Sequence, residues 1–106
     1  MLFQVGAPLL DACVLSFLKR EDTYGYVLTQ ALKEKLEISE STLYPVLRRL
    51  QKEGCLSTYD QPWQGRNRRY YSITGKGVHY AEHLKQAWTD YTNRINGLIQ
   101  GGESCE

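Results

Sequence analysis

The chain has 106 residues, of which 42% are hydrophobic and 24% charged, a composition that fits one globular domain and excludes a disordered chain. The sequence shows no membrane span, no secretion signal and no disulfide framework among its three separated cysteines, so we expect a cytoplasmic protein without a membrane partner. The net charge of +1 conceals a division, because residues 41–76 hold seven basic residues against two acidic ones, a charge of +5, and the remainder carries −4.

Two helices are predicted in the first third of the chain. Apolar residues at helical spacing from Leu10 to Leu18 predict a helix over about residues 9–20. A second apolar run predicts a helix that ends near Leu36, with Asp22 or Thr23 as its cap. Gly25 lies in its first turn, where a small residue permits close packing against a neighbour.

A third helix and two strands follow. Apolar residues from Leu43 to Leu50 predict a helix that starts after a cap at Ser39 and ends at Gly54, which supplies the left-handed residue. Pro45 removes one backbone hydrogen bond, so this helix begins later or bends there. Aromatic and hydroxyl residues predict strands over 55–59 and 69–73, joined by a polar loop over 60–68 whose tip uses Gly65 and Asn67.

The last predicted helix runs from about residue 76 to 99 and is capped by Thr74. Its apolar residues are spaced four and three apart, as in a heptad seam: Leu84, Trp88, Tyr91, Ile95 and Leu98. A single protruding helix would leave this seam exposed, so we expect the seam to be a dimer interface. The chain then divides into a winged-helix domain (1–74), a dimerisation helix (75–99) and a disordered tail (100–106).

Three helices followed by a hairpin indicate a mainly α fold with a two-stranded wing (α+β), a winged helix-turn-helix. In this architecture the third helix enters the DNA major groove and the hairpin contacts DNA beside it. The basic residues fall on these two elements, and short or phenolic donors stand near the start of the third helix. The candidate DNA-binding residues from these patterns are Arg48, Arg49, Lys52, Arg66, Arg68 and Arg69, with Ser41, Thr42 and Tyr44.

Other chemistry is not supported by the sequence. No phosphate-binding glycine loop, nucleophile elbow or His-Glu-x-x-His motif is present, so we expect neither an enzyme nor a cofactor. His79 and His83 have a spacing that can chelate a metal, but no nearby residue completes a set, and we expect no metal site. Trp63 in the hairpin either inserts toward DNA or packs under the loop, and packing is the favoured alternative.

Three sequence blocks resemble one family of bacterial regulators. They are Thr23-Tyr24-Gly25-Tyr26, then Ser41–Leu50 with its Thr-Leu-Tyr-Pro stretch and Glu53-Gly54, and finally Gly65–Thr74 with its Arg-Arg-Tyr-Tyr wing. Together they resemble the PadR family of transcriptional regulators over roughly residues 9–99. The single C-terminal helix is similar to the short class, which includes multidrug-binding repressors.

The resemblance implies a homodimeric repressor that binds a palindromic operator in double-stranded DNA. It places Pro45 within the DNA-reading helix and builds the dimer from the first and last helices. It also implies that Trp88 stacks a small aromatic or lipophilic effector between subunits, with Tyr91 and Phe17 as weaker candidates for the same pocket. The alternative for Trp88 is simple packing of the interface. Alternatives for the whole protein are a protein-interaction winged helix or an architectural DNA-binding module, both without an effector.

Overall fold

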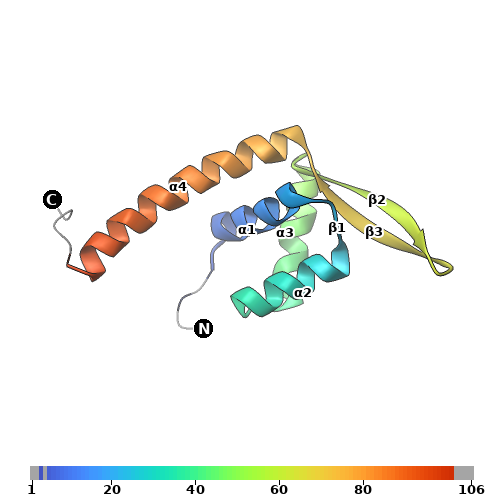
Figure 1. Ribbon diagram of the computed structural model, residues 1–106, viewed down its shortest axis with the longest axis horizontal. Coiled ribbons are helices and arrows are strands. Elements are labelled where there is room, and N and C mark those ends of the chain that lie inside the picture. The colour runs from blue at the N-terminus through green and yellow to red at the C-terminus, as the bar shows by residue number, and fades with distance from the viewer. Residues whose placement is uncertain (1–2, 4, 102–106) are drawn as a thin grey trace.

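The computed structural model describes residue 3 and residues 5–101, and the elements within these residues form an elongated molecule of 59 × 29 × 21 Å (Figure 1). Four helices and three strands are present in this part of the chain: α1 (Ala7–Arg20), β1 (Thr23–Tyr24), α2 (Gly25–Leu36), α3 (Glu40–Lys52), β2 (Leu56–Trp63), β3 (Arg66–Ile73) and α4 (Gly75–Ile99). The β2–β3 hairpin projects from one end of the helical body, and α4 runs over α1 toward the other end. This arrangement confirms the predicted winged-helix class with a long last helix.

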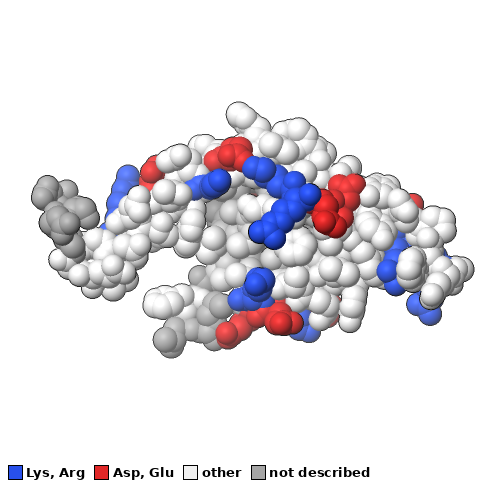
Figure 2. Space-filling model, in the orientation of Figure 1, with Lys and Arg blue, Asp and Glu red and all other residues white. Residues whose placement is uncertain are grey.

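Charged side chains are scattered over a surface that is otherwise mostly uncharged. On the face shown in Figure 2, basic and acidic groups are interspersed over the helical body, whereas blue side chains project from the wing. Within residues 5–101, no helix is long and apolar enough to cross a membrane.

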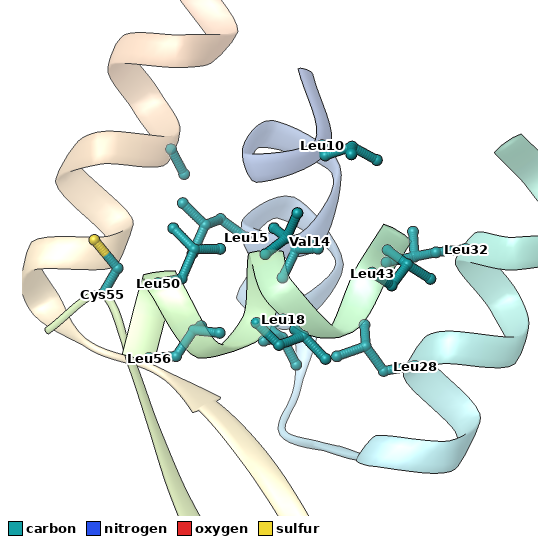
Figure 3. Close-up of a cluster of buried hydrophobic side chains, with 13 residues drawn as sticks. Leu10, Val14, Leu15, Leu18, Leu28, Leu32, Leu43, Leu50, Cys55 and Leu56 are labelled. Carbon is teal, nitrogen blue, oxygen red and sulfur yellow. The ribbon is translucent and has the colours of Figure 1, made fainter. Parts of the chain in front are cut away.

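The core lies where α1, α2 and α3 meet (Figure 3). It is built mainly of leucines, which have a high helix propensity and lie on the face of each helix that points into the core. Leu15 and Leu18 of α1 pack with Leu28 of α2 and Leu43 of α3, and all four side chains are at most 1% exposed. Burying each such side chain contributes about 1.5–3 kcal/mol relative to leaving it in water. This core fixes α3 so that its opposite face is exposed.

Local chemistry explains where the helices begin and end. The Thr74 side chain accepts a hydrogen bond from the Gly77 backbone N–H at 3.1 Å, which confirms the predicted cap of α4. Gly54, at φ 83°, supplies the predicted left-handed residue after α3. Ser39 occupies the N-cap position of α3, but its hydroxyl bonds the hydroxyls of Ser41 and Thr42 rather than the helix backbone. α3 begins at Glu40 and contains Pro45, so the helix does not start later.

The hairpin differs from the prediction. Its strands run to Trp63 and from Arg66, so residues 60–63 and 66–68 form ladder rather than loop. The tip is Gln64-Gly65, both with positive φ, while Asn67 pairs with Pro62 inside the ladder. The predicted loop was wrong because this end of the wing has solvent on both faces, so polar residues there are compatible with strands.

A third strand was not predicted. Thr23 and Tyr24 pair with Tyr71 and Tyr70, which gives an antiparallel sheet in the order β1-β3-β2. These two residues are therefore strand, and the N-cap position of α2 is Tyr24 rather than Asp22 or Thr23. Gly25 follows at once, and a Cβ there would stand 3.0 Å from the Tyr71 ring, which confirms the predicted close packing.

Candidate nucleic-acid interface

α3 presents one continuous exposed row. Leu43, Val46, Leu47 and Leu50 turn inward, so the residues between them face solvent. The exposed row contains Ser41, Tyr44, Pro45, Arg48 and Lys52. Thr42 is also exposed, beside Ser41. The structure thus brings these six predicted residues onto the solvent side of one helix.

The half-buried Tyr71 of β3 lies between α3 and the sheet, beside Tyr44 and Arg69. Burial raises the pKa of Tyr71, and the charges of Arg69 and Arg48 act in the opposite direction. Tyr44, Arg69 and Tyr71 line one hollow of about 260 Å³ between α3 and the sheet. α3 and the wing therefore meet at this hollow, where Arg69 also pairs with Asp60 of β2 at 3.5 Å.

The other two wing arginines lie on the opposite face of β3. Successive residues of a strand alternate between faces, so Arg66 and Arg68 share a face that Arg69 does not. The guanidinium carbon of Arg68 lies 4.5 Å from the centre of the Tyr24 ring and 4.6 Å from that of Trp63. These cation–π contacts hold the guanidinium in place at the wing.

Trp63 packs neither in the core nor beneath a loop. Its side chain is 49% exposed and contacts Arg68 across the wing face. The sequence reasoning also missed Tyr24, because its role depends on the two-residue strand β1. Tyr24 continues a row of rings across the sheet, with Tyr70 at 5.9 Å and Tyr59 a further 5.6 Å beyond Tyr70.

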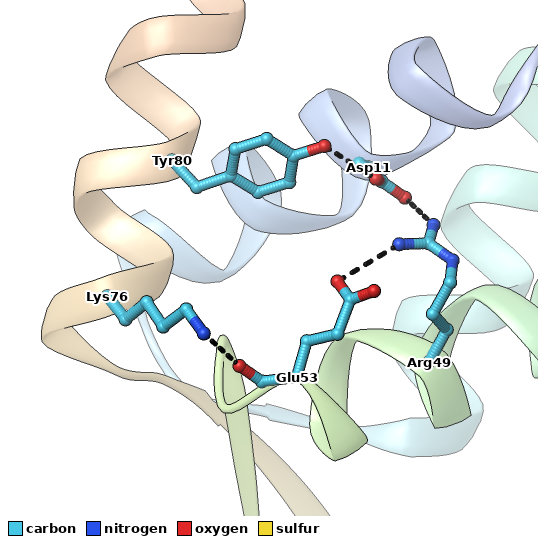
Figure 4. Close-up of polar contacts among 5 residues, drawn as sticks. All are labelled: Asp11, Arg49, Glu53, Lys76 and Tyr80. Atoms are coloured by element: carbon cyan, nitrogen blue, oxygen red, sulfur yellow. Dashed lines mark hydrogen bonds and ion pairs between the residues drawn. The ribbon is translucent and has the colours of Figure 1, made fainter.

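Arg49 is separated from the other α3 cations. Its guanidinium bonds the carboxylate of Asp11 in α1 and reaches Glu53 at 3.3 Å (Figure 4). The bond to Asp11 is the main cause that raises the pKa of Arg49. Arg49 therefore points toward α1 rather than toward the side that its neighbour Arg48 occupies, in contrast to the prediction that both face DNA.

The candidate effector residues lie where α4 crosses α1. Leu84, Trp88 and Tyr91 of α4 line an apolar hollow of about 290 Å³ together with Leu9 and Ala12 of α1. Pro8 of α1 lines it as well, and the sequence reasoning missed all three α1 residues. Phe17, the predicted α1 member, packs against the core and is not among the residues that line this hollow.

The rest of the predicted seam is unevenly covered. Ile95 is half-buried, whereas Leu98 is 70% exposed, Tyr91 57% and Trp88 46%. The distal half of α4 therefore presents a largely uncovered apolar stripe, which is the surface predicted for the dimer.

Both histidines and two of the three cysteines lie in the described part of the chain. His79 and His83 line one hollow with Cys55, but residues 5–101 contain no group of three side chains suited to hold a metal ion. Cys55 is buried, and Cys13 is half-buried, where burial raises the pKa of its thiol. The predicted tail falls mostly on residues 102–106, outside the part of the chain that the structure describes.

Comparison with known proteins identifies similar chains. Residues 14–83 match the model of the transcriptional regulator PadR-like family. A crystal structure of a Streptococcus mutans protein is 40% identical, with a TM-score of 0.87 over 96% of both chains. A PadR-like transcriptional regulator from Bacillus cereus is 35% identical, with a TM-score of 0.78 over 87% of this chain and 92% of its own. A relative from Lysinibacillus sphaericus, described as uncharacterised, is 31% identical over 89% of this chain and 91% of its own.

Proposed function

Since the chain belongs to the PadR-like family of transcriptional regulators, we propose that it is a repressor that binds a palindromic operator as a homodimer. The observation that carries the proposal is the meeting of the exposed α3 row with Arg69 of the wing on this fold. We propose that a small aromatic or lipophilic effector, bound at the dimer interface, relieves the repression.

The α3 row has the chemistry of a DNA-reading surface. Arg48 is exposed and can fork to guanine or to a phosphate, and the Ser41 hydroxyl stands at the helix start, where the backbone N–H groups also favour phosphate. Tyr44 is 43% exposed and adds a phenolic donor. Arg66 and Arg68 supply cationic contacts from the wing, and the ring contacts reduce the freedom that Arg68 would lose on binding.

The proposed homodimer covers the apolar stripe of α4. Leu98 and Tyr91 are largely exposed in one chain, and a two-fold partner would bury both copies. Such a dimer can place two α3 helices about 34 Å apart, one turn of DNA. Leu98→Asp should convert the dimer to monomers in sedimentation analysis, and an unchanged dimer would remove this stripe from the interface.

The hollow beside Trp88 supports the effector. It is apolar, and at about 290 Å³ it fits one or two aromatic rings. The Trp88 ring is 46% exposed and available for stacking. A ligand there relieves repression only if it binds the non-DNA-binding arrangement more tightly.

The test is fluorescence-anisotropy binding to the DNA upstream of the gene, with unrelated competitor DNA and a salt series. We expect specific binding that weakens steeply between about 50 and 200 mM salt. Arg48→Ala should lower operator affinity about tenfold or more, the scale of one bidentate base contact. Lys33→Ala, the same charge change on α2, is the matched control and should have little effect.

Three other outcomes would contradict the proposal. Equal competition by unrelated DNA would indicate an architectural DNA binder. No binding at low salt by a folded dimer would favour a protein-interaction module. An equal loss in Arg48→Ala and Lys33→Ala would mean that α3 does not read the operator.

A further inference from the structure

Asp11 is a charged residue buried inside the helical body. The residue lies on α1 at 2% exposure, between the core residues Leu10 and Val14. A carboxylate in such a position needs strong partners, because burial removes its hydration. The partners of Asp11 come from two other helices.

One carboxylate oxygen accepts from the Arg49 guanidinium of α3, and the other accepts from the Tyr80 hydroxyl of α4 at 3.0 Å (Figure 4). Burial raises the pKa of Tyr80, and so does its bond to Asp11, which keeps the hydroxyl protonated as a donor. A single carboxylate on α1 thus joins the proposed recognition helix to the proposed dimerisation helix.

A second contact joins the same two helices. The ammonium group of Lys76, in the first turn of α4, donates to the Glu53 backbone carbonyl at the end of α3 at 2.6 Å. The Glu53 carboxylate in turn accepts from Arg49 at 3.3 Å. The C-terminal end of α3 is therefore joined to α4 by two contacts, one through Lys76 and one through Tyr80 and Asp11. The exposed α3 row belongs to this same helix.

The two contacts to Asp11 differ in how easily they can be broken. The Arg49–Asp11 pair joins two charges, one of which is buried, so breaking it leaves a buried charge unpaired. The Tyr80 hydroxyl is neutral and makes one hydrogen bond to Asp11, so it can detach while Asp11 keeps Arg49. Trp88 lies eight residues after Tyr80, about two helical turns along α4.

We propose that Asp11 is a positioning residue for DNA recognition, which fixes the angle of α3 against α4, and that the Tyr80 hydroxyl is the contact through which movement of α4 reaches α3. This inference rests on the proposed DNA-binding function and assigns its regulation to Asp11, Arg49 and Tyr80. Neither Asp11 nor Arg49 is required to contact DNA for this role.

The test compares Tyr80→Phe with Tyr59→Phe in the full-length protein. Each removes one tyrosine hydroxyl that donates to a carboxylate, and the Tyr59 bond to Asp22, 2.7 Å long, lies on the exposed sheet. We expect Tyr80→Phe to lower the ratio of operator affinity to unrelated-DNA affinity about fivefold, the scale of one hydrogen bond. A role in stability alone would lower Tm and leave this ratio unchanged. A ratio equal to that of Tyr59→Phe would overturn the proposal.

A salt series separates positioning from direct contact. The double variant Asp11→Asn/Arg49→Gln removes both charges together and leaves no buried carboxylate unpaired. A lost phosphate contact lowers the slope of affinity against salt by about 1. We expect an unchanged slope with a lowered affinity ratio. A slope lowered by about 1 would assign Arg49 to the DNA surface and overturn its positioning role.

Hydrogen exchange keeps the test independent of the DNA result. Tyr80→Phe should raise amide exchange in residues 49–53, and Tyr59→Phe should not. If the wild-type protein shows no operator preference, the proposed function fails while raised exchange still supports the helix coupling. Amide exchange identical to that of the wild-type protein would refute this coupling, regardless of the DNA-binding result.

Discussion

Gly77 stands where the wing joins the long helix, and adding one methyl group there should destabilise the protein. A Cβ on Gly77 would lie 2.2 Å from the Cys55 carbonyl oxygen and 2.7 Å from the Ile73 side chain. The carbonyl oxygen is backbone and already accepts from the Thr74 N–H at 3.1 Å, so it cannot turn aside. Gly77→Ala must therefore move the start of β2 away from α4.

The size of the effect follows from two opposing contributions. Alanine gains up to about 1 kcal/mol over glycine in a helix interior, whereas forcing a methyl group into a packed site costs about 1–3 kcal/mol or more. Because the clash is with backbone, we expect a net loss of about 2 kcal/mol, which lowers Tm by about 10 °C in a domain of this size. Thermal unfolding followed by circular dichroism, at one fixed protein concentration, measures it.

Gly75→Ala is the matched control, two residues earlier in the same helix. No described atom lies within 4 Å of a Cβ at Gly75, so this variant should melt at or slightly above the wild-type temperature. Equal Tm values for the Gly77→Ala and Gly75→Ala proteins would refute the reasoning from the close approach.

Three further predictions concern DNA, effector and pH. Arg66→Ala should weaken binding to operator and unrelated DNA alike and lower the salt slope by about 1, since the role proposed for this exposed wing arginine is a phosphate contact; a loss confined to the operator would assign it to base reading. Trp88→Ala should abolish the response to a planar aromatic dye in anisotropy titrations while operator binding stays measurable, and loss of all DNA binding by a folded dimer would contradict this. Burial raises the pKa values of Tyr71 and Tyr80, so their stabilising contribution is complete below the unfolded tyrosine pKa of about 10 and is lost as pH rises through the folded values. Tyr80→Phe should therefore lose less stability than wild type in urea unfolding between pH 9 and pH 11, and equal losses would refute the assignment.

Local chemistry made the helix ends predictable. Thr74 and Gly54 act through their own side chain or backbone freedom, so the sequence around them was sufficient to place the start of α4 and the end of α3. The strand β1 could not be found this way, because two residues carry no periodicity and Thr23 and Tyr24 are strand only through pairing with β3.

The sequence predicted which residues belong to the candidate site better than it predicted which way their side chains face. The apolar period of α3 identified Arg48 correctly as solvent-facing, but it could not show that Arg49, one position on, meets a partner 38 residues away. A signal for that partner was present, since Asp11 falls on the apolar face of α1 beside Leu10 and Val14. An acid on a buried helical face calls for a cation elsewhere in the chain.

The direct passage from β3 into α4 has a mechanical consequence. Thr74 alone separates the last residue of the wing from the first of the helix, so a hinge at this point acts on a lever. The 25 residues of α4 extend about 37 Å, and a tilt of about 5° at Thr74 displaces the far end of the helix by about 3 Å. Conversely, in the proposed homodimer, small shifts where the two α4 helices meet would be delivered to the wing as rotations about Thr74.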